Sequence, residues 1–173
     1  MGKIPTASEC LKLLEKSGCS KKVIDHCKAV RDLAVKIAKK AGADVNIVEA
    51  GALLHDIGRS KTHGIDHVLE GIKIAKEHDL SKDIIKIIER HVGAGISKDE
   101  AKKLGLPSNS YEPVSLEEKI VCHADNLIQN CKQQSVEKEV KKALKKGYKQ
   151  YAIGIVKLHK ELSDVCGIDL NKI

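Results

Sequence analysis

Phenylalanine and tryptophan are absent from the 173 residues, and three tyrosines are the only aromatic side chains. The hydrophobic core must therefore be built from Leu, Ile, Val and Ala. Proline occurs only three times, so few positions interrupt a helix, and the abundant lysine also favours helices. No apolar run is long enough to span a bilayer, and no signal peptide is recognisable. We therefore expect a helical protein of the cytoplasm with no membrane segment.

Paired cysteine motifs are also lacking. The six cysteines show no Cys-x-x-Cys spacing, and most of them fall in apolar helical stripes. This usage is typical of buried, reduced thiols in an intracellular protein. The chain length suits one domain with a sizeable core.

The charge balance is basic, with a formal net charge of +7. Such a balance favours an anionic partner without singling out nucleic acid. The extra lysines occur as Lys-Lys pairs spread over polar helix faces, where a solvated surface explains most of them. Sites for single-stranded nucleic acid usually stack the bases on aromatic side chains, and three tyrosines provide few of these. A small anionic molecule is therefore the expected partner, ahead of nucleic acid.

Helical periodicity dominates the chain, and no alternating pattern of useful length predicts a strand. Ser20 and Gly42 are typical start and stop residues for a helix over 21–41. Further helices are expected at 67–78, from Leu116 to Cys131 and over 136–165, with a bend near Gly147 or Gly154. The predicted class is all-α, a single-domain helical bundle.

Three parts are expected along the bundle. Residues 1–19 form an N-terminal helix packed on the domain, 20–131 form the core, and 132–173 form a C-terminal helical extension. The extension either covers a site or makes a dimer contact, so the expected state is a monomer or a homodimer.

Asp125 interrupts the apolar face of its helix, one turn from Val121 and Ile128. A carboxylate in such a place must be paired, hydrogen-bonded or bound to a metal. Either it caps or pairs with another helix across the core, or it is a metal ligand.

Histidines break the apolar pattern in the same way. His55-Asp56 ends a helix before Gly58, His91 ends the Ile84/Ile87/Ile88 stripe, and His26 flanks another stripe. A single histidine on an apolar face is usually a core residue. Several of them on different helices, with acids nearby, indicate a metal site within a bundle.

The order His26, His55-Asp56, Asp125 resembles the pattern of the HD-domain superfamily of metal-dependent phosphohydrolases. The segment Ala-Leu-Leu-His-Asp-Ile-Gly-Arg is similar to that family's motif, and the resemblance covers about residues 20–130. It implies an HD-domain helical bundle in which these four residues bind one divalent metal. It also implies that Asp56 bridges to a second ion, or acts as the general base if only one ion binds.

Two further histidines resemble those of the binuclear branches. His67 lies in a His-x-x-x-Gly element that ends at Gly71, and His91 follows 24 residues later. The chain departs from that pattern in its short interval of ten residues between Asp56 and His67. One or two ions of Mn, Fe, Co, Ni or Zn are therefore expected.

Four residues near the motif are candidates for contacting substrate. Arg59 takes the place of a lysine common in the family, and its guanidinium suits phosphate. Lys61 and His63 share its loop, and Tyr111 is placed to stack on a base at the mouth of the site.

The implied activity is hydrolysis of a phosphate ester or anhydride, in a nucleotide or a related small phosphorylated molecule, by metal-activated water. Asp56 and Arg59 are the expected catalytic residues. Activity should fall below about pH 6, because histidines must be neutral to bind a metal. Two alternatives remain open: a di-iron oxygenase on the same fold, and a non-catalytic binding module stabilised by metal.

Overall fold

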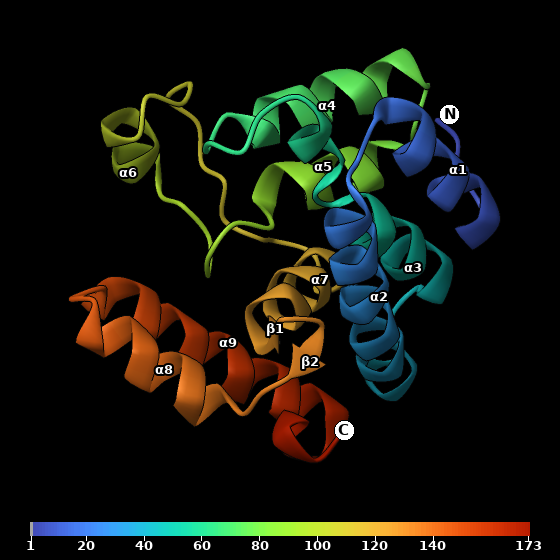
Figure 1. Ribbon diagram of the computed structural model, residues 1–173. Helices are drawn as coiled ribbons and strands as arrows, with labels where there is room; N and C mark the ends of the chain where they lie inside the picture. Colours follow the sequence, from blue (N-terminus) through green and yellow to red (C-terminus); the bar gives the residue numbers. More distant parts are fainter. Residues whose placement is uncertain (1) are drawn as a thin grey trace.

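The computed structural model describes residues 2–173 and shows an all-α domain (Figure 1). In chain order its elements are α1 (Ala7–Ser17), α2 (Lys21–Ala41), α3 (Val45–Leu54), the 3-10 helix η1 (Ile57–Ser60), α4 (His67–Glu77), α5 (Lys82–Arg90), α6 (Lys98–Lys103), α7 (Leu116–Leu127), strands β1 (Ile128–Gln129) and β2 (Lys132–Gln133), α8 (Val136–Lys145), α9 (Lys149–Cys166) and the 3-10 helix η2 (Leu170–Lys172). Within residues 2–173 no helix is long and apolar enough to cross a membrane.

Polar caps set where most helices begin. Side-chain oxygens of Ser20, Asp44, Ser81 and Ser115 accept hydrogen bonds from backbone N–H groups of the first turn that follows them. These N–H groups have no partner within the helix, so a cap satisfies them. Helix α2 ends at Gly42, whose φ of 70° lies in the left-handed region.

An aliphatic core joins α2, α3, α7 and α9, as the lack of Phe and Trp requires. Leu33, Ile37, Val48, Ile120 and Ile155 are among its buried members. A second cluster packs α1 against α3 and α5. In Figure 1 α2, α3 and α7 lie at the centre, with α1 and α4 on one side and the pair α8–α9 on the other.

Two local features differ from the sequence expectation. Helix α7 ends at Leu127, and a short antiparallel hairpin follows, turned by Asn130 and Cys131 at φ 49° and 59°. Tight hairpin turns with two left-handed residues usually have the sequence Asn-Gly. This turn has Asn-Cys instead, so the sequence did not predict the hairpin. The expected helix over 136–165 is divided into α8 and α9 at Gly147, which has φ 79°.

The C-terminal pair is not detached from the rest of the domain. Helix α9 packs on α7 and α2, and α8 packs along α9. The division into parts at residues 19 and 131 stays a prediction.

Candidate metal centre

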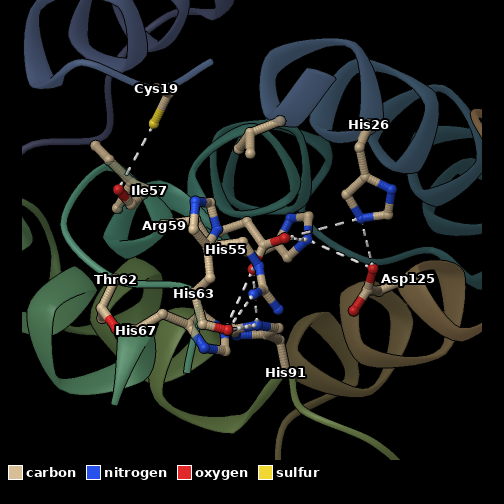
Figure 2. A network of polar contacts seen from close by, with 12 residues as sticks. Cys19, His26, His55, Ile57, Arg59, Thr62, His63, His67, His91 and Asp125 are labelled. Carbon is tan, nitrogen blue, oxygen red and sulfur yellow. Dashed lines mark hydrogen bonds and ion pairs between the residues drawn. The ribbon is translucent and has the colours of Figure 1, made fainter. Parts of the chain in front are cut away.

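Six side chains from five parts of the chain converge at the middle of the bundle. His26 comes from α2, His55 and Asp56 from the end of α3, His67 from the start of α4, His91 from the end of α5 and Asp125 from α7. We call these six residues the ligand cluster. Figure 2 shows the four imidazoles and Asp125 pointing toward one another. His55, Asp56, His67 and His91 are buried, whereas His26 and Asp125 are partly open to solvent.

Asp56 lies between two groups of histidines. Its Oδ1 atom is 3.3 Å from His67 Nε2 and 3.4 Å from His91 Nε2. Its Oδ2 atom is 3.7 Å from His55 Nε2 and 4.0 Å from His26 Nε2. Each carboxylate oxygen therefore faces a different pair of imidazoles, as a bridging carboxylate would.

The second acid completes one of these groups. Asp125 Oδ1 lies 2.8 Å from His26 Nε2 and 3.5 Å from His55 Nε2. Ligand atoms of His26, His55 and Asp125 lie within 4.8 Å of one another, and so do those of His55, Asp56 and His91. Both sets offer the mixture of imidazole and carboxylate that divalent transition metals favour.

Three of the histidines are oriented by their own backbone. The Nδ1 atoms of His55, His67 and His91 lie 2.7–2.8 Å from the carbonyl oxygen of the residue three positions earlier. A carbonyl can only accept, so each Nδ1 donates a proton to it and each ring turns its Nε2 atom toward the centre, where the neutral form of the ring offers a lone pair to a metal ion. Metal-binding histidines are commonly fixed in this manner.

These bare nitrogens fit a cation. His67 Nε2 and His91 Nε2 are 3.1 Å apart, although neither carries a proton to share when both rings are neutral. Two nitrogens that bind the same cation at about 2.1 Å each would lie about 3 Å from one another. His55 Nε2 is buried without a hydrogen-bond partner among the described residues. The donor set therefore fits one or two divalent metals.

The electrostatics also favour positive charge here. Burial opposes protonation of His55, but the carboxylates of Asp56 and Asp125 outweigh it and raise its pKa to about 9. Burial likewise opposes ionisation of Asp56, yet His55, His67 and His91 hold its pKa well below the usual range. The cluster therefore keeps its carboxylates ionised and attracts cations.

Gly58 sets the position of His67. A Cβ atom on Gly58 would lie 1.8 Å from the carbonyl oxygen of His67 and 2.6 Å from the backbone nitrogen of Gly71. Only a residue without a side chain permits this approach of η1 to α4. This close approach lets His67 reach the ligand cluster although only ten residues separate it from Asp56.

Arg59 stands at the edge of the cluster. Its Nε donates to Asp56 Oδ1 at 2.8 Å, and its Nη1 donates to the carbonyl of His63 at 3.2 Å. It lines two hollows, of 270 Å³ and 450 Å³, which also share Asp125. A guanidinium between two hollows and an acidic cluster is placed to meet a phosphate.

The two other candidate substrate contacts in this loop, Lys61 and His63, differ in their position relative to the hollows. His63 lines the larger hollow, together with Lys22 and Asn130. Lys61 is exposed and is placed outside that lining.

Tyr111 requires a correction. Its side chain is only 2% exposed, in a small apolar cluster with Val68 and Ile96, and its hydroxyl donates to the carbonyl of Pro107. A ring packed in this way offers no face to a base, so the expected stacking role is wrong.

A second histidine cluster was missed in the sequence. His123 and His159, which no motif in the sequence singles out, are buried. His123 Nε2 lies 2.9 Å from His159 Nδ1, and His159 Nε2 lies 3.0 Å from Asp169 Oδ1. The spacing Leu116, Ile120, His123, Leu127 is the signal that would have placed His123 on the inner face of α7.

The family model described as HD domain matches residues 23–130, and the chain belongs to the HD-domain family. Its all-α domain and its cluster of His and Asp residues are those of this metal-binding class.

Particular relatives are of two kinds. The chain is 48% identical over 170 residues to the tRNA (cytidine(56)-2'-O)-methyltransferase of Thermoplasma volcanium, covering 98% of this chain but 50% of that protein. It is 48% identical over 132 residues to an uncharacterized protein of Methanocaldococcus jannaschii, covering 73% of this chain and 78% of that one. The chain thus spans about half the length of the curated methyltransferases it matches.

A solved structure shows the same fold. The HD domain of the L. monocytogenes phosphodiesterase PgpH, in complex with cyclic-di-AMP, superposes with a TM-score of 0.61 at 17% identity. The match covers 95% of this chain and 94% of that chain.

Proposed function

We propose that the protein is a metal-dependent phosphohydrolase that cleaves a phosphate ester or anhydride in a nucleotide-containing substrate. The observation that carries this proposal is the place of Asp56, whose two oxygens face two separate groups of inward-turned Nε2 atoms. Such an arrangement suits two ions that share one carboxylate.

The ligands divide accordingly. His26, His55, Asp56 and Asp125 would hold one divalent metal, and His67 and His91 would hold a second one that shares Asp56. A divalent metal bound there supplies Lewis acidity toward a phosphoryl oxygen and makes water a nucleophile at neutral pH. If a single ion binds, Asp56 is the group positioned to take a proton from water.

The chain itself would orient the substrate. Arg59 presents a planar guanidinium beside the cluster, where it can pair with two phosphoryl oxygens. The hollows on both sides of Arg59 and Asp125 leave room for groups attached to the phosphate. The cyclic-di-AMP bound by the PgpH domain and the tRNA named for the T. volcanium relative both support a substrate built from ribonucleotides.

Metal analysis combined with hydrolysis assays tests the proposal. The purified protein should contain transition metal, and after loading with Mn, Co or Ni it should hydrolyse bis-p-nitrophenyl phosphate, a cyclic dinucleotide or a short RNA. Chelation and Asp125→Asn should both abolish turnover. Metal-replete protein that hydrolyses no member of this panel would refute the activity, and would leave a metal-stabilised binding module.

The same four histidines and two aspartates also permit a second function, a di-iron oxygenase. Aerobic oxygen consumption by iron-loaded protein and a mixed-valent iron signal would support it. Phosphate-ester cleavage with redox-inert metals would exclude it as the main activity. Arg59 favours the hydrolase, because a guanidinium beside the ligand cluster suits a phosphate.

A further inference from the structure

The positive charge of the chain is concentrated in one segment. Residues 132–149 contain seven lysines and two glutamates, so this segment alone carries +5 of the net +7. This corrects the sequence interpretation, in which the extra lysines were spread over the surface. We call Lys138, Lys141, Lys142, Lys145, Lys146 and Lys149, on α8 and the turn into α9, the lysine ridge.

The first four ridge residues share one face of α8. Successive residues are about 100° apart around a helix, which places Lys138, Lys141, Lys142 and Lys145 within an arc of about 100°. All of them are exposed except Lys142, which is half-buried. Among residues 2–173 the only carboxylate within 4.0 Å of a ridge lysine is that of Glu139, 3.7 Å from Lys142. Like charges held side by side repel one another, and an anionic partner would relieve this repulsion.

One side of the lysine ridge borders a hollow that leads to the candidate metal centre. Lys142 lines the 270 Å³ hollow together with Arg59, His91 and Asp125. A chain of phosphates lying on the ridge would therefore continue into the ligand cluster.

The other flank and the end of the ridge suit bases. Lys141 and Lys145 border a groove between α8 and α9 that is lined by Val140, Leu144 and Val156. Tyr148 follows the end of α8 and is 59% exposed. Exposed aromatic rings beside lysines are the elements from which single-stranded nucleic acid sites are built.

We propose that the lysine ridge docks single-stranded RNA and directs the strand toward the ligand cluster. This inference rests on the proposed function, whose ribonucleotide class commits it to RNA. A strand carries regularly spaced phosphates and flat bases, which match the row of lysines and Tyr148. A bilayer is planar and does not enter the hollow to which Lys142 leads, so a lipid surface fits less well.

Fluorescence anisotropy with a labelled single-stranded RNA of about 20 nucleotides tests the proposal. The triple variant Lys138→Gln/Lys141→Gln/Lys145→Gln should bind at least tenfold more weakly than the unaltered protein. The slope of log K against log salt should become shallower by about 2, since each lost phosphate contact contributes about 0.7. Tyr148→Ala should weaken binding by about tenfold with the slope unchanged.

A matched control carries the same change of charge on the opposite side of the domain. Lys73, Lys76 and Lys82 are exposed on α4 and α5, away from α8 in Figure 1. Their triple change to Gln should leave RNA binding within about twofold, because no phosphate contact is removed. Equal losses in both triple variants would show that net charge alone matters, and would overturn the proposal.

Two further arms separate the remaining outcomes. Tight, ridge-dependent binding to vesicles of phosphatidylglycerol and phosphatidylcholine that RNA does not displace would overturn the proposal in favour of a membrane surface. Tighter binding of single-stranded DNA of the same sequence would also overturn it.

Hydrolysis of bis-p-nitrophenyl phosphate reports the ligand cluster separately. Ridge-dependent RNA binding without any hydrolysis would refute the proposed activity but uphold the ridge.

Discussion

The protein contains two clusters of buried histidines that use their ring nitrogens in opposite ways. In the ligand cluster, His55, His67 and His91 each give one nitrogen to a carbonyl of their own backbone and turn the other inward. In the second cluster both nitrogens of His159 are occupied, one by His123 and one by Asp169, and only His123 Nδ1 lacks a hydrogen-bond partner among the described residues. The first arrangement leaves free lone pairs at one point, whereas the second ties α7, α9 and η2 together.

Neighbouring carboxylates account for the electrostatic contrast. His55 lies between Asp56 and Asp125, and its pKa is raised to about 9 in spite of complete burial. The pKa of His123 is lowered to about 3, because burial and the neighbouring His159 both oppose its protonation. Equal burial thus produces a site that attracts cations and a site that rejects them. The number of acids, rather than the number of histidines, distinguishes a candidate metal centre from a structural contact.

The largest effect should come from removing the shared acid. Asp56→Asn should lower metal content and reduce kcat/KM at least about 1000-fold, because several kcal/mol of charge stabilisation are lost. Metal analysis and steady-state assays provide the measurement. The matched change in the second cluster, Asp169→Asn, should leave turnover within about twofold. Comparable losses in both variants would contradict the division of roles.

The next effect distinguishes one ion from two. His67→Ala should lower the ratio of metal to protein by about one ion and reduce activity by about 100-fold, as expected for weakened metal binding. Elemental analysis of the variant and of the unaltered protein decides this. An unchanged ratio would show that Asp56 does not bridge to a second ion.

The second cluster should make the fold sensitive to acid. Unfolded chains take up the His123 proton near pH 6.5 but the fold does so only near pH 3, so the unfolded state binds more protons below pH 6.5. This contribution to stability is complete above pH 6.5 and is lost as pH falls toward 3. Between pH 7 and pH 5 it should cost about 2 kcal/mol.

Urea denaturation of metal-free protein at the two pH values measures this loss. His123→Gln retains a hydrogen-bonding group but does not titrate, so its stability should fall by about 2 kcal/mol less than that of the unaltered protein. If both proteins lose the same stability, His123 does not take part in acid unfolding.

The smallest change concerns Arg59. Arg59→Lys keeps the charge but loses the planar pair of donors, and should reduce kcat/KM about tenfold with the metal content unchanged. Assays with bis-p-nitrophenyl phosphate measure the first quantity and elemental analysis the second. A loss of metal in this variant would show that Arg59 mainly holds Asp56 in place.

Local patterns in the sequence were sufficient for most of the fold. Caps such as Ser20 and stops such as Gly42 act within a single turn, so the helix limits followed from them. Asp125 and His91 could be recognised because a polar group on an apolar stripe is conspicuous. The all-α class and the HD family are both confirmed.

Features that depend on how elements meet could not be read in this way. Tyr111 lies in a loop that folds onto α4 and α6, and nothing local shows that its ring is enclosed. His123 and His159 are 36 residues apart, and their contact arises only when α9 packs on α7. The lysines of the ridge can be counted in the sequence, but only the fold places Lys142 in one hollow with Arg59 and Asp125.

The contact between Gly58 and α4 has a consequence for reading genomes. Because two backbones touch there, the position tolerates no methyl group. A homologue that keeps every histidine and aspartate but carries alanine at this position would have its fourth helix displaced. Screening candidate sequences for a glycine three residues after the His of His-Asp would therefore separate intact centres from decayed ones better than counting ligands alone.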